Sequence, residues 1–530
     1  MLKIFWDKLL TTTSGGALLI AFFSVISKLL GFLRDRLLAS YFGAGDILDS
    51  YYAAFKLPDL IFNTLVLGAL ASAFIPVFTK VWLEDKQKAV RLANTILNYL
   101  LGALIILAAL IFILAPYLMK FIVPGFGNEQ LAMTVTFTRV MLVSIIFFGL
   151  SNVLGGILNS LKKFFSFSLA PVFYNLGIIF GITVFYPALG LVGLAWGVVL
   201  GSFLHFVIQL PEALRSGWKY RFLWRVTAEV KRILKLMLPR TLGLAAGQLN
   251  QVVITVIAST LMAGSIAVFN LANNLQSFPI SIFGVSLAIA VFPVFSEALA
   301  RADQDKFRQT FSIHFRRVIF LVIPASVFIL LLRAQIVRVI LGSGNFDWND
   351  TYYTAQVLGW FMVSLFAQSL IPMLARSFYA LEDTKTPVVI SCVAIIINIA
   401  GSIILGRRFG VEGLALAFSI ASIINMLLLL MVLRLKVGYL DDRKIIWSTF
   451  KISCNSIAAG LAVYGMLRVM AAVVDMKTFV GIFTQGLVSG LVGLIVYLGI
   501  SFITSCEEVN VVNRWLARYL KPIFKINPKS

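Results

Sequence analysis

Long apolar segments alternate with short polar connections along the whole chain of 530 residues. A helix needs about 20 apolar residues to cross the hydrocarbon core of a bilayer, and segments of this kind recur from one end of the chain to the other. The pattern predicts an all-α polytopic membrane protein with about 14 transmembrane helices. The expected spans lie at about residues 14–40, 49–79, 92–119, 131–161, 166–187, 189–212, 232–262, 265–299, 309–332, 351–380, 386–406, 411–435, 448–470 and 480–505.

The first twelve spans consist of two copies of one six-helix unit. Four landmarks recur in the same order at nearly constant offsets of 216 to 220 residues. They are Ala44-Gly45 with Ala263-Gly264, Ile75–Phe78 with Phe292–Phe295, Pro171 with Pro387, and Gly190–Ala195 with Gly410–Ala415. Because six is an even number, both copies have the same orientation, related by an axis along the membrane normal.

The repeat predicts two six-helix lobes around a central cavity, followed by two additional helices. We expect an N-terminal lobe at 1–225, a C-terminal lobe at 226–440, and helices 13 and 14 with a basic cytoplasmic tail at 441–530. Two such lobes are typical of transporters that work by alternating access. A duplicated scaffold without transport activity is the alternative.

Charged residues make up 13% of the chain, against about 25% in an ordinary soluble protein, and the formal net charge is +22. About 31 of the 45 Lys and Arg residues fall on the side that holds the N-terminus, and about six fall on the opposite side. This asymmetry places both termini in the cytoplasm. It also explains the positive charge by membrane topology, so we expect no nucleic-acid partner. The first apolar segment lacks a small-residue cleavage site and is expected to remain as an anchor.

The first span carries ionisable side chains at membrane depth, where they are costly and normally face a protein-lined cavity. On a helix, Lys28, Arg34 and Asp35 share an arc of roughly 120° with Ser24, Ser27 and Gly31. The second span continues the pattern, because Asp49, Lys56 and Asn63 are spaced by seven residues and share a face. Pro58 follows Lys56 closely and is expected to kink this helix.

The eighth span is neutral where the first two are charged. Asn270, Asn273, Asn274 and Ser277 form a polar stripe at i, i+3, i+4 and i+7. Amides at this spacing make hydrogen bonds between helices or contact a substrate, and the sequence favours neither.

The cationic wall of the first lobe fits an anionic ligand, since arginine matches phosphate oxygens bidentately and lysine adds a point charge. Three widely separated cysteines and two histidines show no metal-ligand spacing, so we expect no metal site and no catalytic residue. No nucleotide-binding motif is present, and we expect neither ATP hydrolysis nor any other enzymatic activity by this chain.

At these residues the chain resembles the MurJ (MviN) family of lipid II flippases, within the multidrug/oligosaccharidyl-lipid/polysaccharide exporter superfamily. The resemblance spans most of the chain in order, and it rests on Ser27–Asp35, Phe42–Gly45, Asp49, Ala54–Pro58, Gly68–Pro76, Gln209–Pro211, Phe278–Pro279, Phe283–Leu287 and Asp383–Pro387.

The resemblance implies movement of a polyprenyl-pyrophosphate-linked peptidoglycan precursor to the outer leaflet of the bacterial cytoplasmic membrane. It places Arg34 in the central cavity, puts Lys28 where relatives carry another basic residue, and matches Asp35 and Asp49 to acidic positions of the family. Membrane lipids and cell-wall synthesis proteins are the other partners implied.

At two places the chain departs from the family pattern, and the cationic cluster therefore contains fewer positive charges than in many relatives. Many members carry arginine in the second half of span 2, where this chain has Phe62-Asn63, and in span 8, where it has Asn274. The coupling-ion arrangement of the family is not evident here, so a coupling ion and coupling to membrane potential both stay open, and no cofactor is expected. The alternatives are a flippase for another polyprenyl-linked saccharide, a cation-coupled drug exporter, and a non-transporting envelope scaffold.

Overall fold

The computed structural model describes residues 13–67 and 73–509. All regular secondary structure in this part of the chain is helical. In the first half, the helices are α2 Thr13–Phe42, α3 Asp46–Ala54, α4 Lys56–Ile61, η1 Phe62–Leu67, α5 Ile75–Glu84, α6 Lys86–Ile122, α7 Asn128–Ser160, α8 Phe164–Phe180, η3 Gly181–Phe185, α9 Tyr186–Leu189, α10 Val192–Val207, α11 Leu210–Arg215 and α12 Ala228–Ser259. In the second half, they are α13 Ser265–Pro279, η4 Ile280–Val285, α14 Ser286–Ala300, α15 Gln304–Leu331, α16 Arg333–Leu341, α17 Trp348–Met362, α18 Leu365–Ala380, α19 Lys385–Val437, α20 Asp442–Val473 and α21 Phe479–Ile503.

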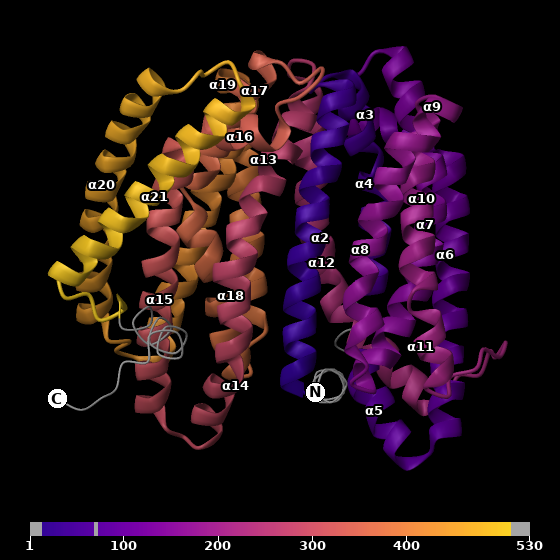
Figure 1. Ribbon diagram of the computed structural model, residues 1–530. Helices are drawn as coiled ribbons and strands as arrows, with labels where there is room; N and C mark the ends of the chain where they lie inside the picture. The colour runs from indigo at the N-terminus through magenta and orange to yellow at the C-terminus, as the bar shows by residue number, and fades with distance from the viewer. Residues whose placement is uncertain (1–12, 68–72, 510–530) are drawn as a thin grey trace, which may run out of the picture. The chain divides into compact units, whose positions relative to one another are not determined.

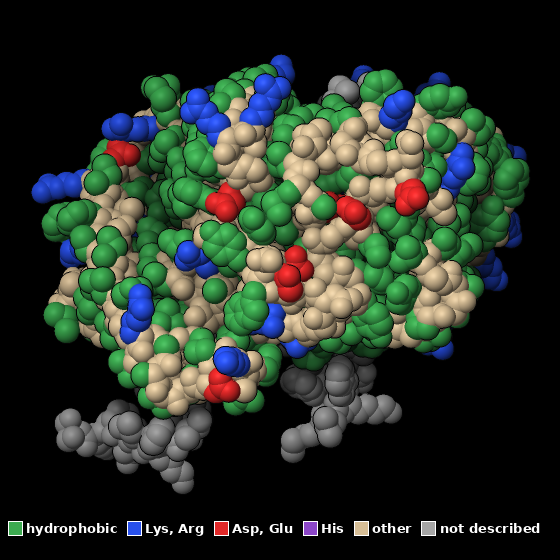
Figure 2. Space-filling model, turned by 90° about the horizontal axis from the view of Figure 1, so that it is seen from above, with side chains coloured by type: hydrophobic (Ala, Val, Ile, Leu, Met, Phe, Trp, Pro, Cys, Tyr) green, Lys and Arg blue, Asp and Glu red, His purple; other side chains and the backbone are tan. Residues whose placement is uncertain are grey.

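The prediction of an all-α polytopic membrane protein is confirmed. Within the described residues, nine helices are long and apolar enough to cross a membrane, and α17 with α18, bent by 47°, form a tenth candidate. Hydrophobic side chains are exposed along the helices and reach the outline of the molecule in Figure 2. The ordered helices follow the fourteen predicted spans, although several spans are broken, and the count of fourteen stays a prediction. Residues 68–72 and the basic tail from 510 onward lie outside the described part.

The chain forms two compact units. The first contains Met1–Asn270 together with Leu341–Asp350, and the second contains Leu271–Ile340 with Thr351–Ser530. The lobe boundaries at 225 and 440 remain a prediction from the sequence repeat.

In the first unit, α10 packs on α7 and α8, α6 packs on α7, and α2 packs on α8. Figure 1 shows α6, α7, α8 and α10 running side by side. The core under α5, α6 and α7 contains the stacked rings of Phe74, Phe78 and Trp82. In the second unit, α15 packs on α18 and α20, and α20 packs on α21.

The backbone repeats along with the sequence. Both η1 and η4 are π-helical turns, and their first residues are 218 positions apart. Gly190 and Gly410 both adopt left-handed backbone angles, with φ of +67° and +61°, a conformation that glycine adopts without steric cost. At Gly410 this conformation divides α19 into two helices, which correspond to the predicted spans 11 and 12. The two copies therefore share local breaks as well as residues.

Pro58 explains the break in the second span. It has no N–H to donate to the carbonyl of Ala54, so α3 ends at Ala54 and α4 begins at Lys56. The Asp59 amide then donates to the carbonyl of Phe55 at 2.8 Å, and the helix resumes. This break places Lys56 in the first turn of a new helix, and a kink of the helix axis at Pro58 stays a prediction.

Candidate functional site

The polar face of α2 carries an ion pair between two adjacent residues. Nε and Nη2 of Arg34 donate to Oδ1 of Asp35 at 2.9 and 2.8 Å. The Asp35 side chain is 3% exposed and that of Arg34 is 20% exposed. Lys28, half-buried on the same helix, interacts electrostatically with both. The three side chains predicted to share a face therefore form one cluster, with a net charge of about +1.

Asn175 from α8 holds the guanidinium of Arg34 from the other side. Its Oδ1 accepts from Nη1 of Arg34 at 3.2 Å. Its Nδ2 donates to Oγ and the carbonyl oxygen of Ser27 at 3.1 and 3.2 Å, and to the carbonyl oxygen of Pro171 at 3.1 Å. Because the amide nitrogen is engaged in this way, the amide oxygen faces Arg34. The guanidinium is thus oriented by two neighbours before any ligand binds.

Sequence reasoning missed Asn175. The available signal was its isolation, because it is the one Asn or Gln in the apolar stretch 164–189. Intramembrane polar residues of this kind normally face protein or a cavity.

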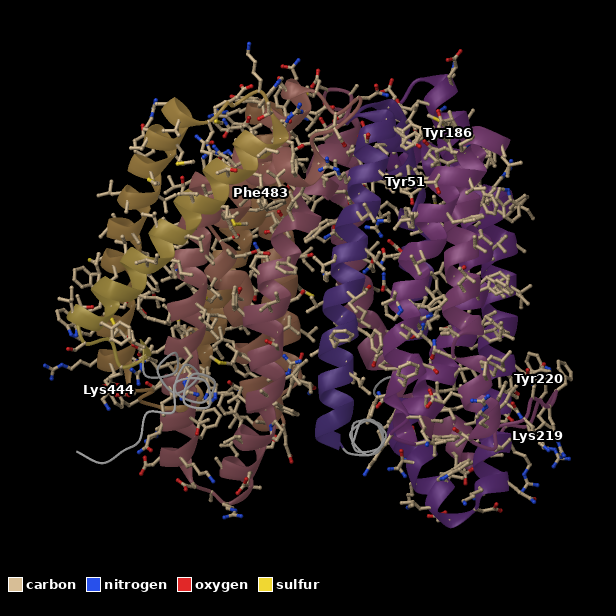
Figure 3. The ribbon with its side chains drawn as sticks, in the orientation of Figure 1. Tyr51, Tyr186, Lys219, Tyr220, Lys444 and Phe483 are labelled. Atoms are coloured by element: carbon tan, nitrogen blue, oxygen red, sulfur yellow. The ribbon has the colours of Figure 1, made fainter. Side chains whose placement is uncertain are left out.

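Aromatic hydroxyl groups surround the same cluster. Tyr51, Tyr52 and Tyr174 all interact electrostatically with Arg34. The Tyr51 ring packs edge-on against those of Tyr52 and Phe55, with centroids 5.6 and 5.1 Å away, and Figure 3 shows Tyr51 among the helices. The buried hydroxyl of Tyr52 has no hydrogen-bond partner among the described residues.

Lys56 on α4 interacts electrostatically with Asp59, three residues later, a carboxylate that sequence reasoning also missed. Tyr174 interacts electrostatically with both Asp59 and Arg34, so it connects Lys56 and Asp59 to the α2 cluster. Asn63 follows on η1 and is half-buried. Lys28, Arg34, Asp35 and Lys56 therefore belong to one polar region of the first unit.

Asp49 has a different environment. It is 2% exposed, and its two oxygens accept backbone N–H groups of Gly264 and Ala267, both at 2.7 Å. These amides belong to the N-terminal end of α13, where four backbone N–H groups lack partners within the helix. The geometry therefore favours a structural role for Asp49 as a cap of α13.

The stripe of amides on α13 bonds largely within its own surroundings. Nδ2 of Asn270 donates to the carbonyl of Ile266, and Nε2 of Gln276 donates to Oδ1 of Asn273. Gln368 of α18 in turn donates to Gln276 at 3.1 Å. Asn274 lies in the second unit and is half-buried. For this stripe the contacts favour helix packing over ligand binding.

The described residues contain no group of three His, Cys, Asp or Glu side chains arranged to hold a metal ion. What the polar region of the first unit offers is paired cations, oriented amides and phenolic hydroxyls. This chemistry fits the oxygens of a phosphate group.

Comparisons with known proteins agree with the fold. A family model described as "Lipid II flippase MurJ" matches residues 38–484. A probable lipid II flippase MurJ of Vibrio cholerae is 31% identical, over 90% of this chain and 93% of that protein. The lipid II flippase MurJ of Burkholderia cenocepacia is 29% identical, over 78% and 82% of the two chains.

Solved structures give the same result. A lipid II flippase MurJ in an inward closed conformation superposes with a TM-score of 0.78 at 26% identity, covering 92% of this chain and 98% of that one. An inward-facing multidrug resistance MATE transporter has a TM-score of 0.67 at 16% identity, over 78% and 96%, which shows a shared fold. The resemblance found in the sequence is confirmed: this multi-pass membrane protein belongs to the lipid II flippase MurJ family.

Proposed function

We propose that this chain moves lipid II, the lipid-linked peptidoglycan precursor, from the inner to the outer leaflet of the bacterial cytoplasmic membrane. The names of its relatives and of the matching family support this substrate. The internal repeat supports alternating access, with lobes at 1–225 and 226–440, helices 13 and 14 as an addition at 441–530, and both termini in the cytoplasm. The chain acts as a transporter and catalyses no reaction.

The observation that carries the proposal is the orientation of Arg34. Its bonds to Asp35 and Asn175 engage three of the five guanidinium N–H groups, so two remain to donate to phosphate oxygens. Lys28 lies six residues earlier, about 9 Å along α2, and adds a second positive charge. Preorganisation of this kind lowers the entropy cost of binding a diphosphate headgroup.

The remaining predicted residues take different roles in this proposal. Lys56, which interacts electrostatically with Asp59, contributes a third cation on the same unit. Asn63 is proposed as a neutral contact near a position where relatives carry arginine, whereas the contacts around Asn274 favour helix packing. Asp49 acts through the helix that it caps. Cell-wall synthesis proteins are the proposed protein partners.

The test is complementation in cells depleted of the protein, with precursor exposure on the outer leaflet as the readout. We expect Arg34→Gln to abolish exposure, Arg34→Lys to restore it in part because lysine keeps the charge without the planar fork, and Lys28→Gln to reduce it. Arg301→Gln is the matched control, because its side chain is 69% exposed and pairs with Glu297 at the surface.

The outcomes separate two parts of the proposal. Full exposure with Arg34→Gln contradicts headgroup binding by the α2 cluster and favours a scaffold role. Unchanged precursor exposure when the wild-type protein is depleted and restored contradicts the substrate.

A flippase for another polyprenyl-linked saccharide is the second candidate, favoured by the absence of the family arginines at Phe62-Asn63 and Asn274. Proteoliposomes that contain either lipid II or a peptide-free polyprenyl-diphosphate saccharide distinguish the two. Preferential transport of the peptide-free lipid would favour the second candidate.

A further inference from the structure

An extended segment with alternating aromatic and cationic residues lies outside the site described above. Segment 218–226 leaves α11 and precedes α12, and it has no regular secondary structure. In an extended chain, successive side chains point to opposite sides. The even positions carry Trp218, Tyr220, Phe222, Trp224 and Val226, and the odd positions carry Lys219, Arg221, Leu223 and Arg225.

Two amides of α6 hold this segment against the helix. Nδ2 of Asn94 donates to the carbonyl of Lys219 at 2.8 Å, and Nδ2 of Asn98 donates to that of Leu223 at 3.1 Å. Oδ1 of Asn98 accepts from the Tyr220 hydroxyl at 3.0 Å. The route of the segment is therefore specified by side chains and is not that of a free loop.

Trp218 is buried, but the other three aromatic side chains of this segment remain exposed even though hydrogen bonds hold the backbone. Phe222 is 71% exposed, Tyr220 52% and Trp224 48%. The Trp224 ring packs edge-on against Tyr99, with centroids 4.7 Å apart. Figure 3 shows Lys219 and Tyr220 projecting away from the helices. Exposed rings on a rigid backbone need a partner that covers them.

The position of the segment along α6 identifies the surroundings of these rings. No charged residue occurs on α6 between Arg91 and Lys120, a rise of about 43 Å, which matches a bilayer including its headgroups. Asn94 lies about 5 Å beyond Arg91, and the Trp224 ring reaches Gly102, about 17 Å beyond Arg91. The segment therefore crosses the boundary between the headgroups and the hydrocarbon, where Trp and Tyr are enriched.

A cavity of about 240 Å³ opens beside the segment, at the end of α6 that carries Arg91. Its polar lining comprises Lys88, Arg91 and Thr95 of α6, Arg225 and Thr227 of the connection, and Glu229 of α12. Lys88 and Glu229 pair with each other at 2.7 Å, whereas the contact of Arg91 with Asp85 is long, at 3.9 Å. Arg225 has no ion-pair partner among the described residues. Two guanidinium groups thus face a cavity that has an excess of positive charge.

We propose that segment 218–226 and this cavity form a binding site for the headgroup of an anionic phospholipid. Arg91 and Arg225 bind the phosphodiester, and Tyr220, Phe222 and Trp224 lie among the adjacent lipids. Clustered basic residues at a membrane surface recognise anionic lipids in this way. The site goes beyond the proposed function and does not depend on it, because its residues are separate from the α2 cluster.

Native mass spectrometry of the purified full-length protein in a neutral detergent tests the site. We expect phosphatidylglycerol to bind more tightly than phosphatidylcholine, and the double variant R91Q/R225Q to bind phosphatidylglycerol about 25-fold more weakly, from about fivefold for each arginine. The control R301Q/R434Q removes two exposed arginines elsewhere and leaves the affinity unchanged. Equal binding of the two lipids, or unchanged affinity in R91Q/R225Q, would overturn the proposal.

Two competition measurements identify the class of ligand. If inorganic phosphate displaces phosphatidylglycerol at equal concentration, the site binds free phosphate and the lipid assignment is overturned. A single-stranded oligonucleotide that binds more tightly than the lipid would also overturn the lipid assignment.

If R91Q/R225Q fails to fold, a second measurement decides the question. Brominated phosphatidylglycerol should quench tryptophan fluorescence less in Trp224→Phe than in the parent protein. Equal quenching in both overturns the placement of the segment in the lipid interface.

Discussion

Replacement of Asp49 distinguishes a residue that caps a helix from one that binds substrate. Its carboxylate accepts two backbone N–H groups at the start of α13, and the side chain is almost completely buried. Asparagine has nearly the same shape but offers one acceptor oxygen, so Asp49→Asn loses one of the two bonds. Alanine loses both and leaves two buried donors unsatisfied.

The expected loss in the free energy of unfolding follows from the number of hydrogen bonds removed. A hydrogen bond to a charged group contributes about 1.5–3 kcal/mol, so Asp49→Asn should lower the free energy of unfolding by about that amount. Asp49→Ala should lower it by about 3–6 kcal/mol, since both bonds are lost. The matched control is Asp46→Asn, which removes an exposed carboxylate in the first turn of the same helix.

Thermal unfolding of the purified variants, all in the same detergent, measures how their stabilities rank. We expect Tm to fall in the sequence Asp46→Asn, Asp49→Asn, Asp49→Ala, with the first equal to the parent. An Asp49→Asn protein that melts with the parent and yet fails to expose precursor on the outer leaflet would refute the capping role and return Asp49 to the substrate site.

Three further perturbations have defined outcomes. Lys56→Gln should reduce precursor exposure less than Arg34→Gln does, because Asp35 and Asn175 orient the guanidinium of Arg34, whereas lysine supplies a point charge without a planar fork; an equal loss would contradict this ranking. Gly197→Val should lower Tm strongly, because a side chain there would meet the backbone of Gly181 on the adjacent helix at 2.6 Å, and an unchanged Tm would argue against this close packing. The Lys436 ammonium, with help from Thr386, holds the pKa of the Asp383 carboxyl below its usual value. Its stabilising contribution is therefore present above the pKa of an unfolded aspartate, about 3.9, and is lost as the pH falls through the lower folded pKa. The Tm of Asp383→Asn should lie below that of the parent by a constant margin from about pH 5 to 8 and converge with it at lower pH; a margin that shrinks between pH 8 and 5 would contradict this.

The sequence by itself determined the features that depend on short stretches of chain. The thickness of the bilayer fixes the length of a spanning helix, so the apolar segments predict the spans directly. Charges are costly in that environment, so Lys28, Arg34 and Asp35 stand out without any structure. Pro58 predicts the interruption between α3 and α4, because the missing N–H acts within one turn.

The tertiary structure decided which of these groups have partners. Asn175 reaches Arg34 across 141 residues, and Asp49 reaches Gly264 across 215. No local periodicity encodes either contact, because helical spacing describes one face of one helix and not the helix packed against it. The sequence therefore placed Arg34 and Asp49 in the same class of polar membrane residues. Only their partners distinguish them. Arg34 contacts an amide that orients its guanidinium, so it is the proposed binding residue, whereas Asp49 accepts the free N–H groups of a helix end and acts as a cap.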